Sequence, residues 1–355
     1  MKEQLMGKPK AEVKWPFKES GESTQIIEVG SSVDFIYIAR KDGEASISPV
    51  AQRISQEYGL GTEDTRNILL SRYDVFFARV IDIFGKAVSE KGHTEIHLYD
   101  PNLLDRAIRK KSKGKQLVSM DPLLNGDANY EVSRVFAQGG QEKSFAYIAR
   151  PGSEPLSIQA KQIADKVGKS SAVLTDDDLY TGGSMLEVLE TLLNQGVKID
   201  KVVPGVQVGE PEKLLNLGIN VEPVIKYKAS DESDIFAKVD IIDPRDYLLG
   251  LSGFVVQLPG GSAGRASAVL PFFSPANAVS VPPGREFQFS LSVLSANLAF
   301  FRGVEEQIGY PLLLSHMDPS CRDFMQRIYN ISPKTTMADL VNWSIGKLRN
   351  SDMHK

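Results

Sequence analysis

The sequence of 355 residues has an ordinary globular composition, 42% hydrophobic and 24% charged, which excludes a disordered chain. Its formal net charge of −4 argues against nucleic acid as a partner, because nucleic-acid-binding proteins normally carry a basic excess. A single cysteine, Cys321, excludes an intrachain disulfide and a cysteine-rich zinc site. The sequence shows no apolar run long enough to span a membrane and no secretory signal, so we expect a cytoplasmic protein without a membrane partner.

Strands and helices are predicted to alternate in the first part of the chain. Residues 33–40 (VDFIYIAR) have the pattern of a strand, and the helical spacing over 47–58 ends at Gly59, a residue suited to a C-terminal cap. A second helix is predicted over 74–90 and a short strand over 95–99. Another helix follows Asp100, and the basic run after it, 109–115, is expected to be a solvated helix end or, as an alternative, a phosphate contact.

The middle of the chain continues this alternation. A hairpin is predicted from the strands 130–137 and 143–150. The elements expected after it are a helix over 156–168, a strand over 171–175, a helix over 184–195 and a strand over 201–208. The alternation from 74 to 245 predicts a doubly wound, mainly parallel α/β sheet.

This pattern divides the chain into three parts. Residues 1–73 form an N-terminal strand–helix region adjoining or belonging to the core, and 74–245 form the α/β core. Residues 246–355 combine a segment rich in proline and glycine, expected to be extended or a β-ribbon, with helices predicted over 287–309 and 336–348. This last part is a candidate cap over the site.

Two segments of the chain are similar to each other. FIYIAR, ending at Arg40, and FAYIAR, ending at Arg150, are each followed by a polar loop with a glycine and by a helix. A duplication and a chance convergence of two βα units explain this similarity equally well. In both cases an arginine lies at the carboxyl end of a strand, where α/β sheets bind ligands, although such arginines also form local ion pairs.

The segment 170–184, SSAVLTDDDLYTGGS, carries the chemistry. An apolar strand leads into the aspartate triplet, which is Asp176, Asp177 and Asp178, and a glycine turn then leads into a helix. Amides of such a turn and of a helix N-terminus bind phosphate, while a carboxylate pair accepts hydrogen bonds from sugar hydroxyls. We therefore predict a pentose 5-phosphate site. Its phosphate loop consists of Tyr180, Thr181, Gly182, Gly183 and Ser184.

This segment resembles the signature of type I phosphoribosyltransferases: an apolar strand, two acidic residues, two mostly apolar residues, a small residue and Thr-Gly-Gly-Ser/Thr. The resemblance implies a sheet of that family's type and a transferase that uses phosphoribosyl pyrophosphate (PRPP) with an unidentified acceptor, and a homodimer is the candidate assembly. It also implies that Asp176 and Asp177 bind the ribose hydroxyls and that Mg²⁺ is held through the substrate and this pair. The pyrophosphate candidates that it implies are Arg150, Pro151, Gly152 and Ser153, with Arg40 as a further candidate.

The segment also departs from that signature. Asp178 replaces an apolar residue and is a candidate general base, and Tyr180 replaces a small residue. The flexible hood that the family inserts before the aspartate strand is absent or is supplied by another segment. Two alternatives are therefore kept: a non-catalytic module that binds PRPP or a nucleotide as a sensor, and a sugar-phosphate phosphohydrolase. Asp176 and Asp178 have the spacing found in haloacid-dehalogenase-like phosphatases.

Other polar and aromatic features are assigned structural roles. His93 and His97 are four residues apart, but no third metal ligand is apparent, so both are expected to be surface or core histidines. The glycine-rich stretch 260–265 matches no nucleotide-binding fingerprint and is expected to be a turn. Trp15 and Trp343 are expected to serve as packing residues.

Overall fold

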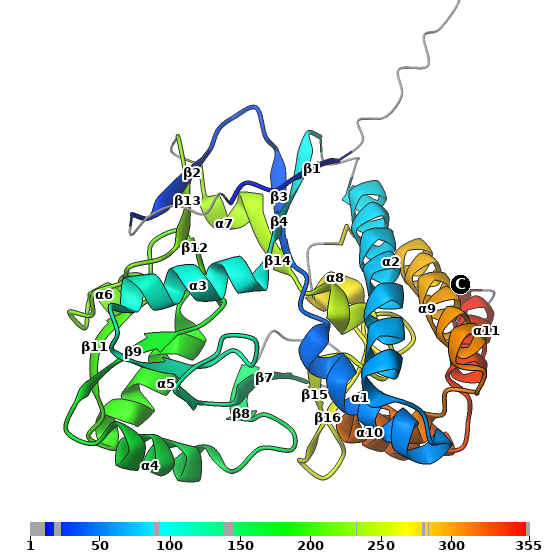
Figure 1. Ribbon diagram of the computed structural model, residues 1–355. Helices are drawn as coiled ribbons and strands as arrows, with labels where there is room; N and C mark the ends of the chain where they lie inside the picture. Colours follow the sequence, from blue (N-terminus) through cyan, green and yellow to red (C-terminus); the bar gives the residue numbers. More distant parts are fainter. Residues whose placement is uncertain are drawn as a thin grey trace, which may run out of the picture.

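A computed structural model describes residues 11–17, 23–88, 92–137, 145–231, 233–278, 281–282 and 284–352. The chain is a mixed α/β protein, and the predicted single sheet is instead divided into four sheets of four strands each within this part of the chain. Helices α3 to α6 gather on one side in Figure 1, and α1, α2, α9, α10 and α11 gather on the other.

The first two sheets are entirely parallel. Parallel pairing fits the near-continuous burial of strands such as β3 and β4, because helices or other sheets cover both faces. The first sheet has the order β1 (Glu12–Lys14), β4 (Thr94–Tyr99), β3 (Phe35–Arg40) and β14 (Val239–Ile242). The second has the order β10 (Asp178–Leu179), β12 (Val206–Val208), β13 (Ile225–Ala229) and β2 (Gln25–Val29).

The third sheet is parallel and the fourth is mixed. The third has the order β11 (Lys198–Val202), β9 (Ser171–Thr175), β5 (Gln116–Ser119) and β6 (Ala128–Asn129). The fourth has the order β16 (Ala263–Arg265), β15 (Val255–Gln257), β7 (Val132–Phe136) and β8 (Phe145–Ala149). In it, β7 and β8 form the predicted antiparallel pair, and the turn predicted at 139–142 lies outside the described residues. The pair β15 and β16 is the β-ribbon expected after residue 246, so 263–265 form a strand and not a turn.

Most helices begin and end close to where the sequence places them. Gly59 ends α1 with a left-handed φ of 67°, as a C-terminal cap requires. The helices are α1 (Glu44–Tyr58), α2 (Thr62–Val88), α3 (Pro101–Ser112), α4 (Leu156–Val167), α5 (Gly183–Asn194), α6 (Glu212–Leu215), α7 (Ile235–Lys238), α8 (Pro275–Ala278), α9 (Glu286–Ile308), α10 (Pro319–Tyr329) and α11 (Met337–Asp352). Two 3₁₀ helices, Pro244–Tyr247 and Leu314–His316, complete the described part of the chain.

Two predicted elements are wrong in their bounds. Helix α2 starts at Thr62, well before residue 74, because Leu69 and Tyr73 extend its buried face toward the N-terminus. The strand expected over 201–208 is divided into β11 and β12, which belong to different sheets. Pro204, which has no N–H to donate, lies between them.

Three hydrophobic clusters hold these elements together. The largest combines α1, α2 and one face of β3 and β4 with α9, α10 and α11, so the N-terminal and C-terminal regions share one core. The second fills the space between the first two sheets and α3. The third packs α4 and α5 onto the third sheet. The boundary predicted between 73 and 74 falls within α2, and the rest of the domain division stays a prediction.

Candidate functional site

The aspartate triplet lies where the chain passes from the third sheet to the second. Strand β9 ends at Thr175 and β10 begins at Asp178. The backbone amide of Gly205 donates to the carbonyl of Asp176, and that of Val206 to the carbonyl of Asp177, both at 2.9 Å. A Cβ at position 205 would lie 2.6 Å from the Asp177 carbonyl oxygen, so the neighbouring chain can approach this closely only with glycine. The triplet is thus fixed at the carboxyl end of a central strand.

The phosphate loop has the geometry that the sequence predicts. Gly182 takes a left-handed φ of 75°, and α5 begins at the next residue. The amide of Leu186 donates to the Gly182 carbonyl at 2.9 Å, so the amides before it in α5 have no carbonyl of their own helix to bind. Unpaired amides at a helix N-terminus are the usual binding site of a phosphate.

The side chain of Tyr180 is anchored to the second half of the α/β region. Its hydroxyl donates to the carbonyls of Phe236 and Val239, both at 2.8 Å, and its ring packs edge-on against Phe236. A tyrosine at this normally small position therefore anchors the loop to α7 and β14.

A cavity of about 240 Å³ opens above the triplet and the loop. The predicted residues that line it are Arg150, Asp176, Asp177, Asp178, Tyr180, Thr181, Gly182 and Ser184. The unpredicted residues that line it include Asp121 at the end of β5, Arg134 on β7 and Tyr147 on β8. We call this the first cavity. Its volume lies just below the range of about 300–1,000 Å³ for small-molecule sites, so it suits a small ligand.

Arg40 reaches the triplet from the first sheet. Its Nη2 lies 2.9 Å from Asp121 Oδ2, 3.1 Å from Asp177 Oδ2 and 3.4 Å from Asp42 Oδ2. Its Nε and Nη1 are buried and have no hydrogen-bond partner among the described residues. Arg40 therefore neutralises the acidic side of the site, whereas its predicted contact with pyrophosphate stays a prediction.

Arg150 also reaches this region, but the rest of its loop does not. Its Nη2 donates to the Met120 carbonyl at 3.2 Å, so both strand-end arginines of the internal similarity meet at the end of β5. The Ser153 hydroxyl donates to the Glu131 carboxylate, and its amide donates to the Arg150 carbonyl at 2.8 Å. Pro151, Gly152 and Ser153 are not among the residues that line the first cavity.

The carboxyl groups of the site have pKa values that are shifted in different directions. Burial, together with repulsion from its neighbours Asp177 and Asp178, raises the pKa of Asp176 far above its ordinary value. Burial and the charge of Asp177 raise the pKa of Asp178 to about 7. Burial also raises the pKa of Asp177, although Arg40 opposes this change. Asp121 differs, because burial raises its pKa but Arg40, the Leu123 amide and Arg150 together outweigh burial and hold the pKa below the ordinary value.

Three carboxylates of the site could hold a divalent cation. One oxygen each of Asp121, Asp176 and Asp177 lies within 4.8 Å of the others. Oxygen ligands suit Mg²⁺, and a cation would relieve the repulsion that, in addition to burial, raises the pKa values of Asp176 and Asp177. The donor set therefore fits the ion that the sequence predicts.

Sequence reasoning missed Asp121 and Arg134. Asp121 follows a short apolar strand, as Asp176 does, and that repetition was the available signal. Arg134 lies on β7 in the fourth sheet, and no sequence pattern connects it with the triplet, so only the fold brings it to the cavity.

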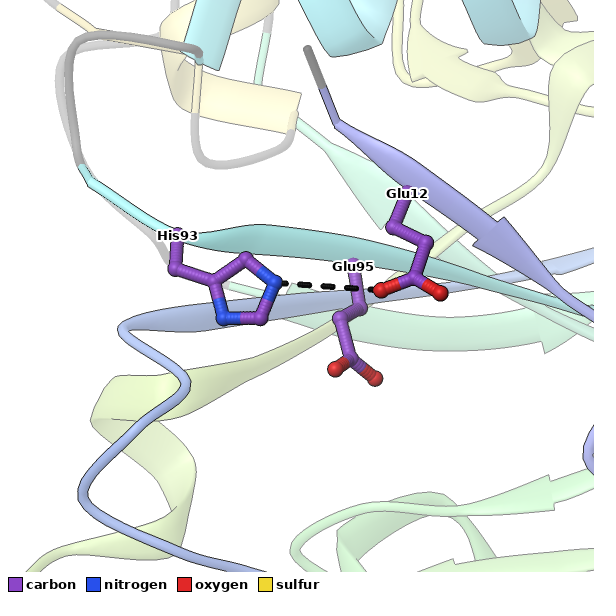
Figure 2. Close-up of side chains that lie close together, drawn as sticks. All are labelled: Glu12, His93 and Glu95. Carbon is purple, nitrogen blue, oxygen red and sulfur yellow. Dashed lines mark ion pairs between the residues drawn. The ribbon is translucent and has the colours of Figure 1, made fainter. Parts of the chain in front are cut away.

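A second acidic group lies far from the triplet in the sequence, at β1 and the start of β4. Figure 2 shows Glu12, His93 and Glu95 side by side, with an ion pair of 3.8 Å between His93 Nε2 and Glu12 Oε2. Lys14 Nζ lies 2.6 Å from Glu95 Oε1 and 3.3 Å from Glu12 Oε2, so an ammonium group already neutralises these carboxylates. His97 is buried and bonds to Glu95 and to the Tyr227 hydroxyl, both at 2.7 Å. His93 is thus exposed and His97 buried, as the sequence predicts, and that neither histidine binds a metal stays a prediction.

Comparisons with known proteins add little to this description. No family model matches the sequence, and no curated protein matches it. Among solved structures, the chain has a weak similarity to adenine phosphoribosyltransferase from Thermoanaerobacter pseudethanolicus, with 14% identity over 36% of this chain and 80% of that one and a TM-score of 0.23. Within the described ranges, no helix is both long and apolar enough to span a membrane. The α/β class therefore rests on the strands and helices themselves, and the function on the site.

Proposed function

We propose that the first cavity binds the phosphoribosyl part of PRPP and that the protein transfers this group to an acceptor. The observation that carries the proposal is the convergence of a carboxylate pair, a helix N-terminus with a left-handed glycine, and an arginine on one small cavity. The carboxylate pair matches the ribose hydroxyls of that substrate, the helix N-terminus matches its 5-phosphate, and the arginine matches its pyrophosphate.

Binding would divide among the groups as follows. Asp176 and Asp177 accept hydrogen bonds from the ribose 2- and 3-hydroxyls. The amides and hydroxyls of the phosphate loop hold the 5-phosphate, and Arg150 faces the pyrophosphate. Mg²⁺, held by the pyrophosphate and by the carboxylates near Asp121, would supply charge stabilisation to the departing group.

The chemistry needs few acid or base groups. The bond from the anomeric carbon to pyrophosphate breaks with its electron pair leaving on pyrophosphate, and an acceptor atom forms the new bond to that carbon. Preorganised charges stabilise the oxocarbenium-like transition state. Asp178 takes the acceptor's proton, for which a carboxyl group with a pKa of about 7 is suited.

The test is a pyrophosphate-release assay with PRPP, Mg²⁺ and pooled acceptors such as nucleobases and pyridines. We expect release that depends on both an acceptor and the metal. Inorganic phosphate is measured in the same reactions, because its release without acceptor would indicate a phosphohydrolase instead.

A second candidate function is binding of PRPP without turnover. The ion pairs of Arg40 with Asp121 and Asp177 favour it, because they already neutralise part of the metal and ribose site. Saturable binding with no release of pyrophosphate under any condition would overturn the transferase in favour of this sensor.

A further inference from the structure

A second and larger cavity lies on the first sheet, at the carboxyl ends of β3 and β4. Its volume is about 600 Å³, within the range of about 300–1,000 Å³ for small-molecule sites. Lys41 and Gly43 after β3, Asp100 after β4, and Tyr73 on α2 contribute to its walls. The carboxyl ends of parallel strands are where α/β proteins bind ligands, and the proposed function does not use the residues that follow β3 and β4.

The second cavity lies beside the first, and the ion pair of Arg40 with Asp121 links the chain segments that line the two. Met120 and Asp121 line the first cavity, and the next two residues, Pro122 and Leu123, line the second. Arg40, whose Nη2 lies 2.9 Å from Asp121, directly precedes Lys41 of the second cavity. The two cavities nevertheless share no lining residue.

An exposed aromatic ring forms part of the second cavity. Trp15, which the sequence assigns to packing, is 58% exposed and lines this space. An indole face is a stacking platform for a flat ring and has little conformational freedom to lose on binding. The ligand that this wall favours is therefore planar and aromatic.

Polar groups around Trp15 can bind the edge of such a ring. The amides of Asn102 and Leu103 both donate to Oδ1 of Asp100, at 2.8 and 3.3 Å, so its Oδ2 is left to accept an N–H. Asn102 and Asn125 are exposed and line the cavity, and their amides offer both donors and acceptors. This combination matches the N–H and ring nitrogen pattern of a nitrogen heterocycle.

The charge of the described walls disfavours a phosphate or carboxylate ligand. Of the three lining carboxylates, Glu44 pairs with Arg66 and Asp74 pairs with Lys41 at 2.6 Å, whereas no ion pair neutralises Asp100 within the described ranges. An anion would meet a net negative wall, which costs free energy, whereas a neutral or cationic ring would not.

We propose that the second cavity is a ligand site for an uncharged or cationic nitrogen heterocycle, such as a nucleobase, which stacks on Trp15 and donates an N–H to Asp100. This inference does not depend on the phosphoribosyl function, because binding in the second cavity needs no group of the triplet or the phosphate loop.

The first test uses the two tryptophans of the chain. In Trp343→Phe, Trp15 is the single tryptophan reporter, and adenine, cytosine and nicotinamide are titrated separately while its fluorescence is followed. We expect saturable quenching by at least one of them and binding of orotate, the anionic control, that is weaker by about tenfold or more. No saturable change at millimolar base, or equal binding of orotate, overturns the proposal.

The second test locates the base by calorimetry. Asp100→Asn keeps the helix cap, because asparagine caps as well as aspartate, but it removes the charge, and Trp15→Leu removes the platform. We expect each to weaken base binding about tenfold or more, with no change in Asp200→Asn, a surface control. Unchanged affinity in both variants, or loss in Asp177→Asn alone, overturns the second cavity as the site. If the base binds as expected in both tests but the pyrophosphate-release assay fails, only the proposed transferase function is contradicted.

Discussion

At the scale of single residues, Arg40 has the largest electrostatic role in the site. Its side chain is 13% exposed and it pairs with Asp42, Asp121 and Asp177. The Asp42 carboxyl is itself 1% exposed, and burial raises its pKa to about 7. Such carboxylates tolerate burial only next to a fixed cation.

We therefore predict that Arg40→Met destabilises the protein by about 3–5 kcal/mol at neutral pH, because it leaves Asp121 and Asp177 without this cation, whereas Asp42 keeps Arg245 at 3.5 Å. The measurement is urea-induced unfolding. Arg109→Met is the matched control, since Arg109 is 43% exposed and pairs with Asp105 at 3.4 Å on the surface of α3. We expect the control to change stability by about 0.5 kcal/mol or less, and an equal effect of both changes would contradict the role of Arg40.

At the scale of elements, the phosphate loop and α5 act as one unit. The left-handed Gly182 lets the chain turn from the triplet into the helix. A Cβ there would meet Leu179 and Leu214 only at 3.8 Å, an ordinary contact, so the cost of a side chain is conformational.

Gly182→Ala is accordingly expected to destabilise the protein by about 1–2 kcal/mol and to weaken phosphate binding. The control is Gly346→Ala within α11, where no atom lies within 4 Å of the added Cβ and φ is not positive. That change should stabilise the protein by about 0.5–1 kcal/mol. Thermal unfolding and titration with PRPP report both effects, and a neutral Gly182→Ala would show that the loop can bind phosphate in another conformation.

The contact between the first two sheets depends on a buried histidine. His97 on β4 bonds to Tyr227 on β13 and to Glu95, and burial lowers its pKa despite the opposing effect of Glu95. The unfolded chain therefore binds a proton more readily than the folded one near the ordinary histidine pKa of about 6.5. The stability that neutral His97 contributes is complete above that pH and is lost as the pH falls from it through the lower pKa of the folded state.

The comparison that isolates this effect is wild type against His97→Gln, measured by urea unfolding from pH 8 to pH 5.5. Glutamine does not titrate, so we expect wild type to be more stable by about 1–3 kcal/mol at pH 8 and this difference to shrink as the pH falls. A difference that stays constant with pH would show that His97 does not change its charge on unfolding in this range.

Local elements were predictable where one short pattern determines them. The apolar run before Asp176, the glycine at position 182 and the periodicity of α5 lie within a few residues of one another, and β9, the turn and α5 are confirmed. Arg40 and Asp121 are 81 residues apart, so the ion pair between them depends on long-range packing of β3 against the neighbouring sheet. For the same reason the division into four sheets was not predictable from the alternation of strands and helices.

At the scale of the whole molecule, the site is assembled from distant parts of the chain. Strands β7, β8 and β10 and the residues that follow β5 and β9 contribute to the first cavity, and the first sheet supplies Arg40. Helices of the N-terminal and C-terminal regions share one core behind that sheet (Figure 1). Asp177 lies where these parts meet, so a change at this residue tests the function of the assembled site.

The direct test is a calorimetric titration of PRPP with Mg²⁺ into wild type, Asp177→Asn and the surface control Asp200→Asn. We predict saturable binding to wild type and an affinity weaker by about tenfold or more in Asp177→Asn, because it loses a charged hydrogen-bond acceptor worth about 1.5–3 kcal/mol. The thermal midpoint of this variant should stay close to wild type, and the control should bind like wild type. No binding to wild type, or equal affinity in Asp177→Asn, would contradict the phosphoribosyl site.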